Sequence, residues 1–386
     1  RRLRGGSGLV LGGRVMLAGA PGAAAALSLD RRITLVSGTN GKTTTTALTV
    51  AAMQDGEPVG TNRGGANTSV GVAGTLATTD ATRVVLEVDE GWLPWVIRET
   101  SPRAVILANL TRDQLSRHHE VGAVAASWRR ALAGVPAVVA NADDPAVVWP
   151  ALAARWQTWV SVGMAWTADS TVCPACGRRL LRTSDSWACS GCDLHRPSPG
   201  WWLEHDVLCS PTSRTRLDLR LPGRFNLANA ALAIVAACVT DGVPPETAAA
   251  RLREVDAVSG RFERLRYHGR DVRIMLAKNP AGWLEMLQLM APDPHPVVLL
   301  FNADGVDGRD PSWLYDVSFA PLRGRQVLVQ GRRATDLLVR LEHDDVPAEH
   351  VLGSLADALL RLPHGRVDVV GNYTAFRQAV QEVHRG

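Results

Sequence analysis

Short apolar runs alternate with helix-length segments along most of the chain. The first run, residues 33–36, leads into a glycine-containing loop and then into a helical pattern over about residues 43–53. Similar runs recur at 83–88, 104–107 and 137–140, with helical stretches between them. This alternation is typical of a parallel sheet with helices on both faces. The pattern therefore predicts an α/β fold.

The alternation is interrupted once and then starts again in a second series. Residues 168–208 break the pattern and are interpreted as an insertion, and a helix is predicted at about 226–239 after it. Further strand-length runs follow at 272–276, 297–301, 326–329 and 367–370. A chain of 386 residues has room for two or three domains with buried cores. We expect a short N-terminal segment (1–30), an α/β domain (31–256) that carries the insertion (168–208), and a Rossmann-like C-terminal α/β domain (257–386).

Composition and charge exclude several classes of protein. Apolar residues make up 46% of the chain and charged residues 21%, which is typical of globular proteins and not of disordered chains. No apolar run approaches the roughly 18–20 residues of a membrane-spanning helix, and the basic, then glycine-rich start does not resemble a signal peptide. The net charge of +4 favours acidic ligands such as phosphates, or an anionic membrane surface, but is too small to indicate nucleic-acid binding.

A phosphate-binding loop stands between the first predicted strand and its helix. It reads Gly38-Thr39-Asn40-Gly41-Lys42-Thr43-Thr44. We expect its glycines to let backbone N–H groups surround phosphate oxygens at the start of the helix. Lys42 is predicted to reach the β- and γ-phosphates of ATP, and the Thr43 hydroxyl to ligate Mg²⁺. Lys42 is one of only two lysines among 42 basic residues, and an arginine could not replace its compact ammonium group.

A magnesium ion at this loop requires a carboxylate from elsewhere in the chain. Glu87, Asp89 and Glu90 lie at the end of the predicted strand 83–88. We select Glu87 as the metal ligand; the alternative is a solvated acidic strand end. Asp113 also follows a predicted strand, and a helix N-cap is an equally good interpretation of it.

Four of the six cysteines are spaced like the ligands of a zinc ribbon. They are Cys173, Cys176, Cys189 and Cys192, two CxxC pairs separated by 12 residues. Four thiolates suit tetrahedral Zn²⁺ and leave no open position, so we predict a structural zinc site. Redox CxxC motifs are a weaker alternative. A nucleic-acid-binding ribbon is weaker as well, because only three arginines supply positive charge there.

Together these motifs resemble the Mur ligase family, whose members use ATP to convert a carboxylate into an acyl phosphate that an amine then attacks. The phosphate loop is similar to the loop of that family, residues 221–230 resemble its adenine-binding segment, and residues 259–263 resemble the start of its C-terminal domain. Only about 32 residues precede the first strand, so the family's UDP-sugar-binding domain is expected to be missing. The stretch 127–130 lacks the lysine that many members carbamylate, and Gln114 replaces a metal-associated histidine.

These departures and the cysteine insertion resemble one branch of the family, the MurT-like subunits of lipid II isoglutaminyl synthase. The branch is marked by the segments 64–67, 112–115, 277–282, 307–313 and 372–374. Ser116 departs from it, because an aspartate is usual there. The resemblance implies a Mur-ligase-like P-loop central domain that phosphorylates the α-carboxylate of D-glutamate in the lipid II stem peptide. Ammonia from a separate GatD-like glutaminase subunit, the partner in a heterodimer, would then give D-isoglutamine.

The resemblance also implies roles for individual residues near the substrates. Asn226 and Asn229, three residues apart on one predicted helix, would bind adenine; the alternative is helix capping. Arg261 would contact the γ-phosphate or the substrate, with a surface arginine as the alternative. Lys278 would contact the acyl phosphate or the substrate carboxylate.

A further implied role concerns the partner glutaminase. Asp310 would complete the partner's Cys-His pair by holding the histidine, with Asp307 and Asp316 as second and third choices. An Asp/Gly turn is the alternative interpretation of this segment. The resemblance implies work in the cytoplasm at the inner face of the bacterial cell membrane, with peripheral membrane contact only. An amino-acid-adding Mur-type or folylpolyglutamate-type ligase and a non-catalytic scaffold with the Mur fold remain open as other functions.

Overall fold

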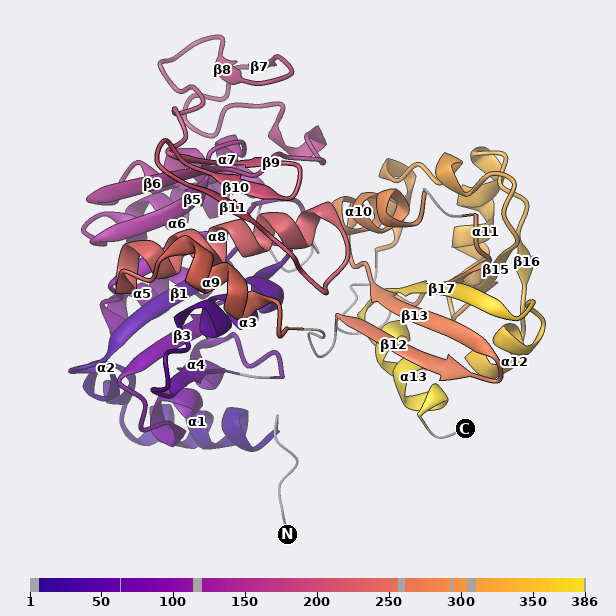
Figure 1. The fold of residues 1–386 in the computed structure, drawn as a ribbon, viewed down its shortest axis with the longest axis horizontal. Helices are drawn as coiled ribbons and strands as arrows, with labels where there is room; N and C mark the ends of the chain where they lie inside the picture. The colour runs from indigo at the N-terminus through magenta and orange to yellow at the C-terminus, as the bar shows by residue number, and fades with distance from the viewer. Residues whose placement is uncertain are drawn as a thin grey trace. The chain divides into compact units, whose positions relative to one another are not determined.

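The apolar runs of the sequence form strands, which collect into two large sheets (Figure 1). The computed structural model describes residues 7–62, 64–113, 120–255, 261–291, 294–303 and 310–384. The chain divides into two units, residues 1–112 with 118–256 and residues 113–117 with 257–386. Of the positions singled out in the sequence, Gln114, Ser116 and Asp307 lie outside the described residues.

A nine-stranded sheet forms the core of the first unit. Its strand order is β11-β10-β9-β6-β5-β4-β1-β3-β2; the strands from β2 to β9 in this order run parallel, and β9, β10 and β11 pair antiparallel. The central strands are buried on both faces, which explains why they read as continuous apolar runs without alternation. The strands are β1 (Arg32–Ser37), β2 (Val59–Thr61), β3 (Arg83–Glu87), β4 (Ala104–Leu107), β5 (Ala137–Asn141), β6 (Trp156–Ser161), β9 (Trp201–Glu204), β10 (Val207–Cys209) and β11 (Arg214–Arg216).

Helices cover both faces of this sheet. On one face α3 packs against α8 and α9, and on the other α4, α5, α6 and α7 share a buried apolar cluster with alternate residues of the central strands. The helices are α1 (Ser7–Gly19), α2 (Ala23–Ser28), α3 (Lys42–Met53), α4 (Ser69–Thr78), α5 (Leu93–Thr100), α6 (Val121–Leu132), α7 (Pro145–Ala151), α8 (Arg224–Asp241) and α9 (Pro245–Leu252). No helix in the described part of the chain is both long enough and apolar enough to span a bilayer.

Between β6 and β9 the chain leaves the sheet and forms a small separate layer, which we call the cysteine layer. It contains η1 (Ala168–Ser170) and the antiparallel pair β7 (Leu180–Arg182) and β8 (Trp187–Cys189). Leu180 and Trp187 pack with Val148 of α7 in a buried cluster. The chain then returns with β9 and β10, so the stretch 168–208 that interrupts the sequence pattern includes two strands of the main sheet.

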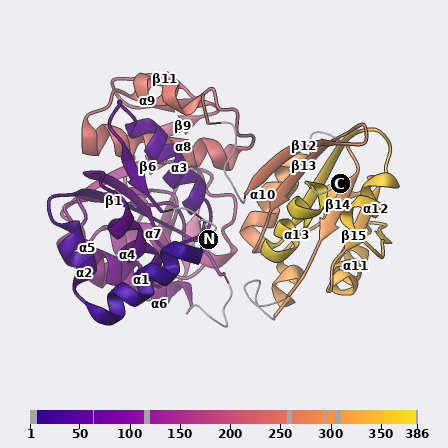
Figure 2. The same ribbon diagram turned by 90° about the horizontal axis from the view of Figure 1, so that it is seen from below.

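The second unit contains a six-stranded sheet of order β12-β13-β17-β14-β15-β16. Figure 2 labels four of its strands, β12, β13, β14 and β15. Among these described strands only β12 pairs antiparallel, and it joins β13 through a tight turn at His268 and Gly269, both with positive φ. A buried ion pair links neighbouring strands, from Nε of Arg273 to Oδ1 of Asp368 at 2.6 Å. The elements are β12 (Phe262–Tyr267), β13 (Arg270–Leu276), α10 (Pro280–Met290), β14 (Val297–Leu300), η3 (Ser312–Asp316), η4 (Ala320–Leu322), β15 (Val327–Gln330), α11 (Ala334–His343), β16 (Glu349–His350), α12 (Leu355–Leu360), β17 (Gly365–Gly371) and α13 (Tyr373–Val383).

Candidate active site and metal centre

The phosphate loop runs from the end of β1 into the first turn of α3. Gly41 precedes α3 with a φ of 80°, and a Cβ there would lie 2.5 Å from Oδ1 of Asn229. Gly38 has a φ of 148°, and a Cβ there would lie 3.0 Å from the backbone oxygen of Asn109. Both positions need glycine, because a side chain would be strained and would meet these neighbours. The loop backbone is therefore free to approach an anion at the N-terminus of α3.

A second loop, residues 109–112 after β4, holds the phosphate loop in place; we call it the support loop. Asn109 accepts a hydrogen bond from the N–H of Asn40 at Oδ1 (2.8 Å) and donates from Nδ2 to the oxygen of Asn40 (3.0 Å). The hydroxyl of Thr39 accepts from the N–H of Thr111 (3.0 Å) and donates to its oxygen (3.1 Å). These reciprocal hydrogen bonds hold the phosphate loop in position against the support loop. This function of Asn109 and Thr111 could not be predicted from the sequence, because both residues lie outside the phosphate-loop motif.

Lys42 is buried behind the loop and is fully bonded there. Its Nζ donates to two carbonyl oxygens of the loop at 2.6 and 3.2 Å and to Oε2 of Glu90 at 2.8 Å. Burial alone would lower the pKa of Lys42, but the paired Glu90, with smaller contributions from the charges of Glu87 and Asp89, raises that pKa above its ordinary value. The ammonium group therefore stays charged at neutral pH, as binding of a phosphate requires.

Two of the three carboxylates at the end of β3, Glu87 and Glu90, are buried. Glu87 is 4% exposed; its Oε1 accepts from Nδ2 of Asn67 at 3.0 Å, and Asn62 bonds both its N–H and its carbonyl oxygen at 2.8 Å. Glu90 is 6% exposed and makes the ion pair with Lys42. Neither side chain belongs to a solvated acidic strand end. The structure thus groups Glu87, Glu90 and Lys42, and the direct partner of the lysine is Glu90.

The two asparagines of α8 lie beside the phosphate loop, and both are buried. Asn226 donates from Nδ2 to the carbonyl oxygen of Pro222 at 2.7 Å, just before the start of its own helix. Asn229 lies against Gly41, as the 2.5 Å approach to a Cβ there shows, and donates to Oδ1 of Asn226 at 3.5 Å. The fold therefore brings Asn229 to the loop, and Asn226 lies about one helical turn before it in α8.

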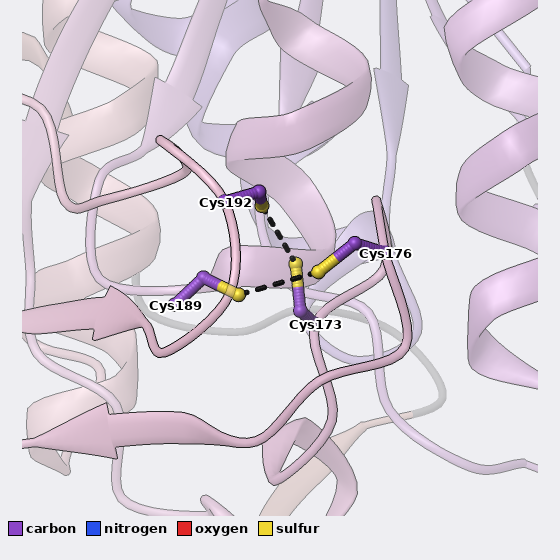
Figure 3. Close-up of side chains that lie close together, drawn as sticks. All are labelled: Cys173, Cys176, Cys189 and Cys192. Carbon is purple, nitrogen blue, oxygen red and sulfur yellow. Dashed lines mark hydrogen bonds between the residues drawn. The ribbon is translucent and has the colours of Figure 1, made fainter.

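Figure 3 shows the side chains of the four spaced cysteines converging on one point. Their sulfur atoms all lie within 4.8 Å of one another, with 3.7 Å between Cys173 and Cys192 and 3.4 Å between Cys176 and Cys189. A tetrahedral zinc ion with Zn–S bonds of about 2.3 Å separates its sulfur ligands by about 3.8 Å, so this cluster can hold zinc. Four sulfur ligands would leave no position for a substrate, which makes the role structural.

The remaining candidate residues belong to the second unit. Nζ of Lys278, at the end of β13, donates to a carboxylate oxygen of Asp113, which is grouped with this unit. Arg261, next to β12, is half-buried and accepts the N–H of Leu276 at its carbonyl oxygen. Asp310 is exposed, and the N–H of Ser312 donates to its Oδ1 at 2.9 Å. That bond lowers the pKa of Asp310 below its ordinary value and keeps the group ionised.

The parallel sheet and the phosphate loop at the start of α3 define a nucleotide-binding α/β protein, and comparison with known families identifies its family. Residues 36–237 match the model of the Mur ligase middle domain, and residues 276–376 match that of the MurT ligase C-terminal domain. The first match alone covers more than half of the chain. The chain belongs to the Mur ligase family.

Within that family, the chain resembles one kind of subunit along nearly its whole length. Subunit MurT of the lipid II isoglutaminyl synthase (glutamine-hydrolyzing) of Streptococcus pneumoniae is 29% identical over 379 residues, which cover 90% of this chain and 84% of that protein. Among solved structures, a pseudomurein peptide ligase type C from Methanothermus fervidus has a TM-score of 0.73 at 18% identity and covers 92% of this chain and 78% of its own. MurF ligase from Thermotoga maritima in complex with ADP has a TM-score of 0.63 at 14% identity, with 94% and 83% covered. These two likenesses show the shared fold.

Proposed function

We propose that this chain is the ligase subunit of a lipid II isoglutaminyl synthase and acts in peptidoglycan biosynthesis. It would use ATP to activate the α-carboxylate of D-glutamate in the lipid II stem peptide and transfer ammonia to it. The observation that carries the proposal is the phosphate loop, with the buried Lys42 charged beside Glu90 and Glu87. The match of residues 276–376 to the MurT C-terminal domain supports the choice of amide product over an added amino acid.

The reaction would proceed in two steps, phosphorylation of the carboxylate and then attack by ammonia. A carboxylate oxygen of D-glutamate attacks the γ-phosphorus of ATP, the bond to the bridging oxygen breaks, and ADP leaves. The nitrogen of ammonia then attacks the carbonyl carbon of the acyl phosphate. Phosphate leaves with the electrons of its C–O bond, and a proton of the ammonia goes to solvent. The first step is needed because a free carboxylate is a poor electrophile, whereas phosphate is a good leaving group.

The first unit supplies the groups for nucleotide binding and phosphoryl transfer. Lys42 would exchange its bonds to the loop carbonyls for the β- and γ-phosphates and stabilise negative charge that develops during transfer. Thr43 and Glu87 offer a hydroxyl and a carboxylate, the oxygen ligands that Mg²⁺ prefers, and this ion would neutralise phosphate charge when bound. Asn229 and Asn226 would bind adenine through their amides.

The second unit supplies contacts to the acceptor and to the partner. Lys278 and Arg261 would bind the substrate carboxylate or the acyl phosphate. Ionised Asp310 would hold the histidine of a GatD-like glutaminase in the tautomer that its cysteine needs, because a carboxylate stabilises the imidazolium form. Since lipid II is embedded in the membrane, the complex would work at the inner membrane face through peripheral contact.

The proposal is tested by mass spectrometry of a lipid II analogue incubated with the chain, ATP, Mg²⁺ and excess ammonium salt. We expect conversion of the D-glutamate carboxylate to the amide without any partner. Conversion only after addition of the glutaminase and glutamine would still assign the reaction to the complex. No amide under either condition would contradict the proposal and favour an amino-acid-adding ligase or a scaffold.

A further inference from the structure

Three consecutive backbone N–H groups of the support loop are each bonded by a side chain. The N–H of Thr111 donates to the hydroxyl of Thr39 in the phosphate loop at 3.0 Å. On either side of it, the N–H of Leu110 donates to Oδ2 of Asp144 at 2.8 Å and the N–H of Arg112 to Oδ2 of Asp169 at 2.9 Å. The middle bond holds the phosphate loop, and the two outer bonds hold the support loop itself.

Asp169 comes from the cysteine layer, not from the nucleotide-binding core. It lies in η1, four residues before Cys173, and its side chain is 1% exposed. Besides the N–H of Arg112, it accepts from Nε of Arg112 and from Nε1 of Trp166, the latter at 2.7 Å. Three donors therefore converge on one buried carboxylate, which an ionised carboxylate with two oxygens can satisfy and a neutral amide cannot.

The outer bond on the other side also leads to the cysteine layer. Asp144 stands in the β5–α7 turn, residues 142–144, which two hydrogen bonds tie to that layer. Nε1 of Trp187 donates to the carbonyl oxygen of Ala142 at 3.2 Å, and Nε of Arg196 donates to Oδ1 of Asp143 at 2.7 Å. Trp187 is also packed against α7 in the cluster that includes residue 173. The layer is thus bonded to both ends of the three-bond array, directly at one end and through the β5–α7 turn at the other.

Within the layer itself, the cysteine-bearing β-hairpin is joined to η1. Nη2 of Arg182, in β7, donates to the hydroxyl of Ser170 at 2.5 Å, one residue after Asp169. Backbone hydrogen bonds also close the turns that carry the cysteines, such as the one from the N–H of Cys189 to the oxygen of Leu194. A change in the cysteine cluster can therefore reach Asp169 through bonded neighbours within one folded layer.

We propose that Asp169 is a positioning residue for nucleotide binding: it ties the cysteine layer to the support loop, so that an intact layer sets the affinity of the phosphate loop for ATP. The inference rests on the proposed function, since it assumes that the loop binds ATP. It gives the cysteine layer a function beyond its own stability. Asp169 acts on the nucleotide through Arg112, Thr111 and Thr39, and it does not contact the nucleotide.

The test compares nucleotide affinity in the full-length chain and in Asp169→Asn. The asparagine keeps the size of the side chain but leaves one oxygen for three donors, so the support loop loses at least one bond. We expect the Kd of a fluorescent ADP derivative to rise about tenfold, the size of coupling that bonded networks carry. The KM for ATP should rise in parallel while kcat at saturating ATP stays within about twofold, because bound nucleotide restores the loop. Asp185→Asn, an exposed position in the same layer, is the matched control and should bind as the unaltered chain does.

A second variant and the removal of zinc test the same proposal independently of Asp169→Asn. If Asp169→Asn does not fold, Trp166→Phe removes a single donor from Asp169 and should raise the same Kd in the same direction by a smaller factor. Removal of zinc from the unaltered chain with a chelator should also weaken ADP binding, while hydrogen exchange at residues 109–112 becomes faster. An unchanged Kd for ADP in these variants, or a fall in kcat without a change in KM, would overturn the role of Asp169 as a positioning residue.

An unchanged Kd for ADP after zinc loss would overturn the proposal that the cysteine layer sets nucleotide affinity. An unaltered chain that binds no ADP would instead contradict the proposed function.

Discussion

Replacing Lys42 by alanine is expected to lower the rate of ATP-dependent amidation by about 10²–10³-fold, the usual loss when one preorganised donor to developing charge is removed. The side chain is the ammonium group that the structure holds at the phosphate loop, buried and kept charged by Glu90. Its loss removes a positive charge at the point where the γ-phosphoryl group would transfer. The rate would be measured as amide formed on a lipid II analogue with ammonium salt.

Two further variants separate this effect from a general loss of structure. Lys42→Arg keeps the charge but not the compact ammonium, and we expect it to remain well below the rate of the unaltered chain. Arg130→Ala removes an exposed cation from α6 in the same unit and should leave the rate unchanged. Because Lys42→Ala leaves Glu90 buried without its partner, its folding would be checked by thermal unfolding. A folded Lys42→Ala chain that amidates at the full rate would support the non-catalytic scaffold.

Replacing Asp310 by asparagine is expected to reduce glutamine-dependent amidation by about 10³–10⁴-fold and to leave ammonium-dependent amidation unchanged. The magnitude is that of removing the carboxylate from a catalytic triad, where the histidine is left in the wrong tautomer. The N–H of Ser312 that donates to Asp310 can also donate to an asparagine oxygen, so the local turn should persist. Both rates would be measured on the complex with the glutaminase.

Asp345→Asn is a matched control for this experiment. Asp345 is an exposed aspartate of the same unit with a φ of 54°, a conformation that asparagine also adopts readily. We expect it to leave both rates unchanged. If Asp310→Asn lowers the ammonium-dependent rate equally, the residue acts in the ligase reaction or in folding, and its assignment to the partner's active site is wrong.

The strands and helices around the phosphate loop could be predicted closely from the sequence. The runs at 83–88, 104–107 and 137–140 correspond to β3, β4 and β5 within one residue at each end, because buried parallel strands are continuous apolar segments bounded by polar ones. The helix at about 43–53 corresponds to α3. Local composition was sufficient here, since each of these strands is a continuous, mostly buried apolar run and the helix follows a recognisable loop motif.

Elements whose stability depends on distant partners could not be predicted in this way. β9, β10 and β11 have three or four residues each, too few for a period, and they exist because they extend the main sheet. α1 packs on α4 through Gly13 and Gly74, where a Cβ at Gly13 would lie 1.8 Å from the oxygen of Val70. Nothing near Gly13 in the sequence indicates that contact.

The same distinction holds for the candidate site. The phosphate loop and the cysteine cluster could be identified because their ligand-binding residues are close together in sequence. Glu90 as the partner of Lys42 could not, because three acidic residues stand together at the end of β3 and only the backbone geometry selects among them. Thr111 of the support loop is bonded to Thr39 across 72 residues, and Arg112 is bonded to Asp169 across 57, so no local pattern contains these contacts.

The most direct test of the account follows the oxygen atoms of the substrate. If the α-carboxylate of D-glutamate in a lipid II analogue is labelled with oxygen-18, an acyl phosphate intermediate requires one labelled oxygen to leave with phosphate. We predict one oxygen-18 atom in the released inorganic phosphate for each amide formed. Amide formation with unlabelled phosphate would contradict the central claim that this chain uses ATP to activate the carboxylate.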